Sequence, residues 1–249
     1  MRRTTTARLA LLALALAAAG AARPARAGTA YTLTLLGTLP GGTFSEGQGV
    51  NDSGQVTGYS FFPNGTTHAF LSGPGGGPLK DLGTLGGGSS VGLGVNASGQ
   101  VAGGSTTNPG SFTTHAFLSG PDGGALKDLG TLPGFANSVG QAVNASGQVA
   151  GASSIAGGAT HAFLSGPNGG ALVDLGTLGG TVSRGFGVND SGQVVGDSDT
   201  ASAQFHAFLY SGGGMLDLNS LIAPGSSLTL FQAYSITDLQ ESRFTSSPA

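Results

Sequence analysis

The sequence predicts an all-β fold, a β-propeller-like array of four-stranded repeats. Gly accounts for 48 of the 249 residues, and each Gly inside a helix costs about 1 kcal/mol relative to Ala. Residues 28–249 show no sustained apolar period of 3.6 residues, the period typical of a helix. Three motifs return every 43–48 residues, a spacing within the range of propeller blades, roughly 40–50 residues. Together these observations predict four full blades of about 46 residues and a partial closing blade.

Residues 1–27 are expected to form a secretory signal peptide that is cleaved near Ala27. A start with three arginines precedes an apolar run at 9–19, and Ala25-Arg26-Ala27 supplies small residues at the cleavage site. The run is shorter than the ~20 residues that a membrane span needs. We therefore expect a secreted protein, extracellular or periplasmic, with no transmembrane span in the mature chain.

Cleavage would change the charge of the chain. Five of the 9 basic residues lie in residues 1–27 and all 12 acidic residues follow, so the formal net charge moves from −3 to 4 − 12 = −8. So few basic residues argue against nucleic acid as a partner. The chain has no Cys, which excludes disulfides and cysteine-ligated zinc. We expect a monomer without a cofactor.

The repeats cover approximately 46–88, 89–134, 135–180 and 181–222 within one domain, 28–249. The first strand of each repeat ends in Val-Asn, and the second begins with Gln-Val. The link Asn-x-Ser-Gly is typical of a type I turn followed by a left-handed Gly. Asn-x-Ser is also a glycosylation sequon, but the turn explains Asn, Ser and Gly together. These structural positions are Asn51, Asn96, Asn144 and Asn189, with Gly54, Gly99, Gly147 and Gly192.

The third and fourth strands carry His-Ala-Phe-Leu and Leu-x-Asp-Leu, joined by a Gly-rich hairpin link. His and Asp stand 13 residues apart in three repeats and 11 apart in the fourth. Deleting an even number of residues at a hairpin tip keeps the same residues on one face. We therefore expect each His to lie opposite its Asp and bond to it, with Phe70 opposite Leu79 and Phe208 opposite Met215. The structural pairs are His68 and Asp81, His115 and Asp128, His161 and Asp174, and His206 and Asp217.

The two ends resemble isolated strands of further repeats. Residues 31–39 match a fourth strand, and 231–238 match a first strand. A sheet in which these two ends meet would close the ring and hide both sheet edges. We expect such a partial closing blade.

The motifs His-Ala-Phe, Asp-Leu-Gly-Thr-Leu-Gly-Gly and Val-Asn-x-Ser-Gly-Gln-Val-x-Gly resemble those of the bacterial extracellular HAF-repeat family. The likeness spans about Leu33 to Asp238. It implies an exported bacterial protein that is built of repeats and propeller-like. It implies no defined biochemical activity.

The sequence favours a non-enzymatic scaffold that presents loops to an extracellular glycan or protein, and we assign no catalytic, cofactor or metal residue. One alternative is a secreted enzyme acting on polysaccharide at the channel mouth, with Glu46, Arg184, Asp197 and Asp199 as the candidate catalytic residues. Another is a metal-binding ring of the four repeat histidines, since imidazole suits Zn, Cu or Ni. Aromatic residues outside the motifs could stack on sugar rings or fill gaps between blades: Phe44, Phe61, Phe62, Phe112, Phe135 and Phe205.

Overall fold

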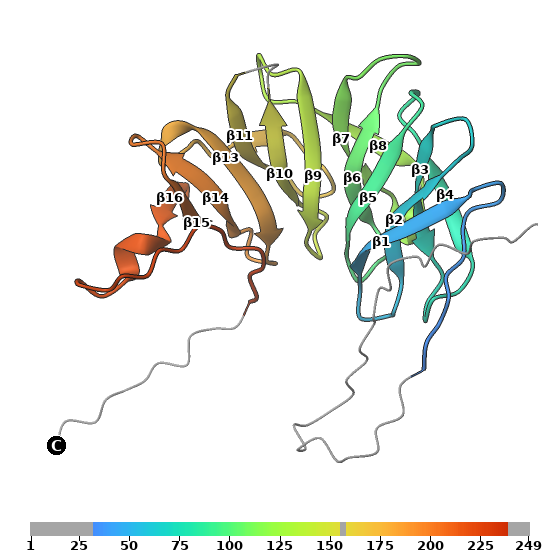
Figure 1. Ribbon diagram of the computed structural model, residues 1–249, viewed down its shortest axis with the longest axis horizontal. Helices are drawn as coiled ribbons and strands as arrows, with labels where there is room; N and C mark the ends of the chain where they lie inside the picture. The colour runs from blue at the N-terminus through green and yellow to red at the C-terminus, as the bar shows by residue number, and fades with distance from the viewer. Residues whose placement is uncertain (1–31, 155–157, 239–249) are drawn as a thin grey trace, which may run out of the picture.

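The computed structural model describes residues 32–154 and 158–238, so the predicted signal peptide lies outside the described residues. This part of the chain is all-β apart from two short 3-10 turns, η1 (Pro121–Gly123) and η2 (Leu218–Leu221) (Figure 1). Among the described residues, no helix has the length and apolar character to cross a membrane.

Consecutive strands pair antiparallel in groups of four. The first two sheets contain β1 (Phe44–Val50), β2 (Val56–Phe61), β3 (Thr67–Ser72), β4 (Leu79–Gly83), β5 (Ser90–Val95), β6 (Val101–Thr106), β7 (Thr114–Ser119) and β8 (Leu126–Gly130). The next two groups contain β9 (Asn137–Val143), β10 (Val149–Ser154), β11 (Thr160–Ser165), β12 (Leu172–Asp174), β13 (Gly179–Val188), β14 (Val194–Thr200), β15 (Phe205–Ser211) and β16 (Gly214–Asp217). These last two groups are joined by one parallel pair, Thr160 with Val182.

The sheets stand side by side in chain order, with β1–β4 and β13–β16 at opposite ends of the row (Figure 1). First strands of adjacent sheets, such as β5 and β9, contact one another. The expected closing sheet does not form. Neither residues 32–39 nor 231–238 form a strand, because no second or third strand lies between them to pair with their backbones in the described chain.

The Asn-x-Ser-Gly link has the expected turn geometry. The backbone N–H of Gly54 donates to the carbonyl of Asn51 at 2.9 Å, and Gly54 has φ +70°. A side chain is strained at this φ, whereas Gly adopts it freely. The other three turn glycines have φ between +69° and +74°.

The predicted register between third and fourth strands is wrong by two residues. Phe70 lies opposite Asp81 rather than Leu79, and Phe208 lies opposite Asp217 rather than Met215. The offset is already present beside the hairpin link, where Ser72 pairs with Leu79. Beyond Phe70 a bulge adds one further residue, because Ala69 pairs with Gly83 and Leu82 is left over. The Phe–Asp pairing recurs in all four repeats, so the two-residue deletion does keep the register.

The core lies between neighbouring sheets. Phe163 is fully buried there against Val149 of its own sheet and against Ala116 and Leu118 of the preceding sheet. First and second strands approach so closely that a Cβ on Gly151 would lie 2.0 Å from a backbone oxygen of the first strand. Part of the Gly excess therefore reflects close packing within the sheets as well as turns.

Candidate functional site

The repeated asparagines join one repeat to the next. The amide nitrogen of Asn96 donates to the backbone carbonyl of Asn144, and that of Asn144 donates to Asn189, each at 2.9 Å. Both side chains also bond to the Gln four residues later. We call Asn51, Asn96, Asn144 and Asn189 the asparagine ladder. Three of its members are only 4–6% exposed, so their amide nitrogens serve the fold rather than a glycan.

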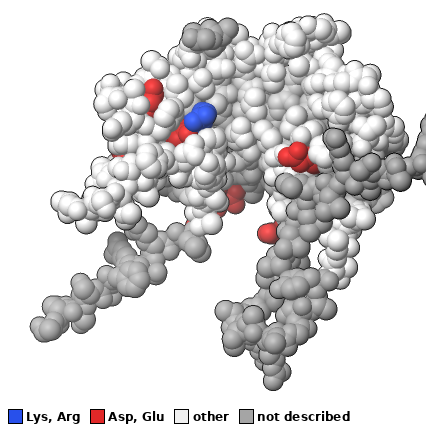
Figure 2. All heavy atoms as spheres, viewed as in Figure 1, with Lys and Arg blue, Asp and Glu red and all other residues white. Residues whose placement is uncertain are grey.

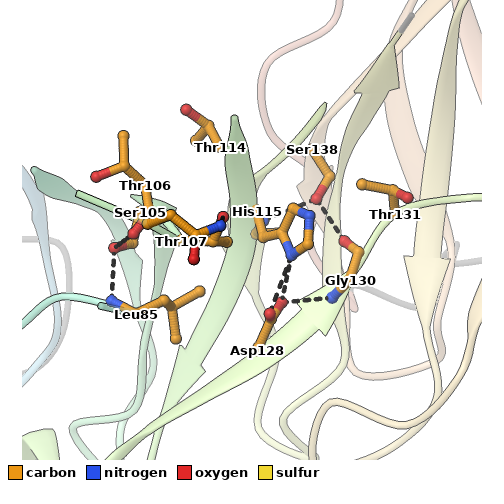
Figure 3. Close-up of polar contacts among 12 residues, drawn as sticks. Leu85, Ser105, Thr106, Thr107, Thr114, His115, Asp128, Gly130, Thr131 and Ser138 are labelled. Atoms are coloured by element: carbon orange, nitrogen blue, oxygen red, sulfur yellow. Dashed lines mark hydrogen bonds and ion pairs between the residues drawn. The ribbon is translucent and has the colours of Figure 1, made fainter. Parts of the chain in front are cut away.

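A serine in the first strand makes a second contact between repeats. The hydroxyl of Ser138 accepts from the Ala116 N–H at 2.8 Å and donates to the Gly130 carbonyl, both in the preceding repeat (Figure 3). The bulge frees these two backbone groups, and the buried hydroxyl satisfies both. Ser90 and Ser183 make the same pair of bonds. Sequence reasoning missed both contacts, although each recurs at the repeat spacing.

Each His contacts the Asp that the spacing assigns to it. Nδ1 of His115 lies 2.9 Å from Asp128, which also accepts the Gly130 N–H (Figure 3). The other three pairs have distances of 2.7–2.9 Å. The four pairs belong to four separate sets of strands, and among the described residues no three His, Cys, Asp or Glu converge on a metal site. The ring of metal-binding histidines is therefore not assembled in the described chain.

Hydrogen bonds lower the pKa of Asp217. Burial alone would raise this pKa, but bonds from His206 and from the amides of Asn219 stabilise the carboxylate more. Because this pKa is lower in the folded state, the ionised Asp217 stabilises the folded protein at pH values above the unfolded-state pKa of about 3.9. That stabilisation is lost as the pH falls through the folded-state pKa. We expect the melting temperature to fall with acidification from about pH 4, and less steeply in Asp217→Asn. Equal slopes in a melting series would contradict this.

Two of the candidate catalytic residues form a structural ion pair. Nε and Nη2 of Arg184 donate to Asp197 at 2.9 and 2.6 Å, and Gln232 adds a third donor at 2.7 Å. Asp197 is fully buried. The hydrogen bonds that Arg184 donates to Asp197 help to raise the pKa of Arg184. All these groups are partnered, so the cluster holds residues 231–238 against β13 and β14.

The other two candidate catalytic residues lie elsewhere. Glu46 accepts the Tyr59 hydroxyl at 2.8 Å in the first sheet, which raises the pKa of Tyr59. Asp199 accepts the backbone N–H groups of Thr181 and Val182 at 3.1 and 2.6 Å. Each carboxylate satisfies its own local donors. The four candidate catalytic residues therefore do not converge on one catalytic site.

The aromatic residues outside the motifs gather at one end of the sheets. In each sheet, the first and third strands begin at the same end at which the second strand finishes. We call this end, which carries the links 62–66, 107–113 and 201–204, the loop end. Phe112 is 96% exposed there, and Phe44, Phe61 and Phe205 are 38–39% exposed. Phe62 and Phe135 instead pack against the core and against the rings of His68 and His161. Phe62 and Phe135 therefore fill space in the core, whereas Phe44, Phe61, Phe112 and Phe205 keep an exposed surface.

The loops at the loop end carry no charge. The second-to-third links at 62–66, 107–113 and 201–204 contain Asn, Ser, Thr and Gln but no Asp, Glu, Lys or Arg. Charged side chains are also sparse on the face seen in Figure 2. Neutral hydrogen-bonding groups beside exposed phenyl rings can bind an uncharged, hydroxyl-rich ligand.

A shallow cavity lies at the opposite end, beside the Asn-x-Ser-Gly turns. Its volume is about 350 Å³, and Asn144, Asn189, Asp190 and Asp238 are among its lining residues. Asp190 accepts the Ala145 N–H at 2.8 Å, and Asp238 accepts the Asp190 N–H at 3.1 Å. These carboxylates are engaged in joining repeats, so this cavity is the weaker candidate site.

No family model matches the chain, and no curated protein matches it. Among solved structures, TolB from Acinetobacter baumannii aligns with a TM-score of 0.50 and 14% identity over 74% of this chain and 44% of its own. A putative TolB from Agrobacterium tumefaciens aligns with a TM-score of 0.53 and 15% identity over 77% and 68% of the two chains. A gluconolactonase from Xanthomonas campestris reaches only 0.39, too low to relate the two folds.

The two TolB proteins are β-propellers, so these similarities show a propeller-like all-β fold. The chain spans less than half of the Acinetobacter protein. At identities of 14–15%, the likeness concerns the fold alone.

Proposed function

We propose that the protein is an exported, non-enzymatic scaffold that binds a neutral glycan at its loop end. One observation carries the proposal: exposed phenyl rings and uncharged Asn, Ser, Thr and Gln side chains share this end. Sugar rings present apolar C–H faces that stack on aromatic rings, and their hydroxyl groups pair with neutral donors and acceptors. A protein ligand would instead favour Tyr, Trp and Arg anchors, and the chain has no Trp.

Export is part of the proposal. The basic start, the apolar run and the Ala-x-Ala site of residues 1–27 support it, as does the resemblance to extracellular HAF-repeat proteins. The motif residues serve contacts within and between repeats, which leaves the variable loops for recognition. Function in this account resides in the residues that do not repeat.

The proposal is tested by a binding screen of the purified protein against neutral and acidic polysaccharides immobilised on one surface. We expect retention by a neutral polysaccharide and little dependence on salt, because no charge pairing is involved. Retention by acidic polymers alone, or turnover of the polysaccharide, would contradict it.

Phe112→Ala is expected to weaken binding of the retained polysaccharide about two- to tenfold, the loss of one stacking contact of roughly 0.5–1.5 kcal/mol. Titration by calorimetry measures the change. Asp238→Ala, at the opposite end of the sheets, is the matched control and should bind like the original protein. Weaker binding by the control alone would place the site in the shallow cavity instead.

A further inference from the structure

Residues 32–39 occupy the place of a fourth strand before the first sheet. The Leu39 N–H donates to the Ser60 hydroxyl at 3.2 Å, as the Leu85 N–H donates to Ser105. Gly37 has φ +73°, like the Gly of each Asp-Leu-Gly motif. In β3–β4 and its equivalents, the fourth strand pairs with a third strand. Residues 33–35 make no backbone hydrogen bond within the described chain.

Residues 231–238 occupy the place of a first strand after the last sheet. The amide of Asn189 reaches the Thr237 carbonyl at 3.4 Å, which continues the asparagine ladder. Asp238 accepts the Asp190 N–H just as Asp190 accepts the Ala145 N–H. Residues 228–230 lead into this segment and are exposed. Within residues 32–154 and 158–238, the row of repeats thus ends in an incomplete repeat on both sides.

Both incomplete ends expose the same short sequence. Leu33-Thr34-Leu35 has leucines 59% and 81% exposed, and Leu228-Thr229-Leu230 has leucines 72% and 43% exposed. Neither 32–39 nor 228–236 contains a charged residue. The backbone N–H and carbonyl of Leu230 bond to Asn219 and Ala207, and the Leu228 N–H bonds to Ser226. The backbone groups of Thr34 and Thr229, at the centre of each short sequence, make no hydrogen bond within the described chain. An uncharged edge with such free backbone groups is a template for strand addition.

We propose that these two edges pair between copies of this chain, residues 33–35 of one copy lying antiparallel to residues 228–230 of another. The occupant is a second copy because the two edges lie at opposite ends of the row, where one chain cannot bring them together (Figure 1). Antiparallel pairing sets Thr34 opposite Thr229 and each Leu opposite a Leu, and such cross-strand pairs stabilise sheets. The contact is head-to-tail, so it extends the row of repeats.

The test measures the mass of the purified protein by light scattering across a concentration series. We expect assembly above the single-chain mass. Leu35→Glu and Leu228→Glu should each reduce the mass to that of one chain, because each places a charge in the paired edge. Val173→Glu, which changes a half-exposed residue of β12, is the control and should still assemble.

Mixing the two variants gives the sharper readout. Each retains one intact edge, so a head-to-tail contact predicts that the mixture forms a dimer of one copy of each and nothing larger. Thr34→Pro removes a backbone donor from the same edge and should behave like Leu35→Glu even if the latter folds poorly. A single-chain mass for the original protein at every concentration, or a mixture that stays monomeric, would overturn the proposal.

Discussion

Phe163→Ala is expected to lower the free energy of unfolding by about 3–5 kcal/mol, the usual cost of removing a buried phenyl ring. Phe163 is 0% exposed and contacts Val149 and Leu132 between the second and third sheets. The surrounding strands are held by backbone pairing and cannot collapse fully into the space. Urea denaturation followed by circular dichroism measures the change.

Phe112→Ala is the matched control for this prediction. It makes the same substitution at a residue that is 96% exposed, and the expected change is within about 0.5 kcal/mol. Equal losses in the two variants would mean that the interfaces between sheets are not the core of the protein.

Asn144→Ala is expected to lower the free energy of unfolding by about 2–4 kcal/mol, because buried partners lose their hydrogen bonds. The side chain accepts from the backbone N–H groups of Ser146 and Gln148. It donates to the Gln148 side chain and to the Asn189 carbonyl, both at 2.9 Å. The same denaturation measurement applies, with Asn108→Ala in an exposed loop as the control.

Asn144→Asp separates the turn from the ladder. The carboxylate still accepts from the N–H groups of Ser146 and Gln148. Its second oxygen replaces Nδ2 and faces the Gln148 side-chain oxygen and the Asn189 carbonyl, so an acceptor stands where a donor is needed. We expect a loss comparable to that of the Ala variant. A variant as stable as the original protein would show that the contact between repeats contributes nothing.

The local structure could be predicted from sequence because it depends on short spacings. Asn-x-Ser-Gly places an acceptor and a left-handed Gly within one turn, and the His–Asp spacing fixes one hairpin. The bulge at Asp81-Leu82-Gly83 escaped prediction because a Gly in a strand has many uses. It adds one unpaired residue beyond the Phe70–Asp81 pair and lies beside the Ala69 and Gly83 backbone groups that Ser90 binds.

Contacts between repeats were harder to predict because they join residues about 45 positions apart. One of them leaves a trace in the sequence. Lys80 and Lys127 each donate to a backbone carbonyl in the third-to-fourth link of the following repeat. The equivalent residue in the third repeat is Val173, and the link that follows it is two residues shorter. The substitution thus accompanies the loss of the loop that a lysine would reach.

The candidate site was predictable only as a set of aromatic residues. The sequence singled out six phenylalanines, but their fates depend on packing that the chain reveals only when folded. Phe135 packs into the core between sheets and Phe62 packs with Leu39 and Phe70 at the first sheet, whereas Phe112 faces solvent. The open row could not be predicted, because the two terminal segments each match a strand and the match says nothing about whether they meet.

The central claim is that the repeated residues hold the sheets together while the non-repeating residues of the loop end bind the ligand. The affinity of Phe112→Ala and Asn144→Ala for the retained neutral polysaccharide, measured at a temperature where both are folded, tests it most directly. We predict weaker binding in Phe112→Ala and unchanged binding in Asn144→Ala. Unchanged binding in Phe112→Ala with lost binding in folded Asn144→Ala would contradict the account.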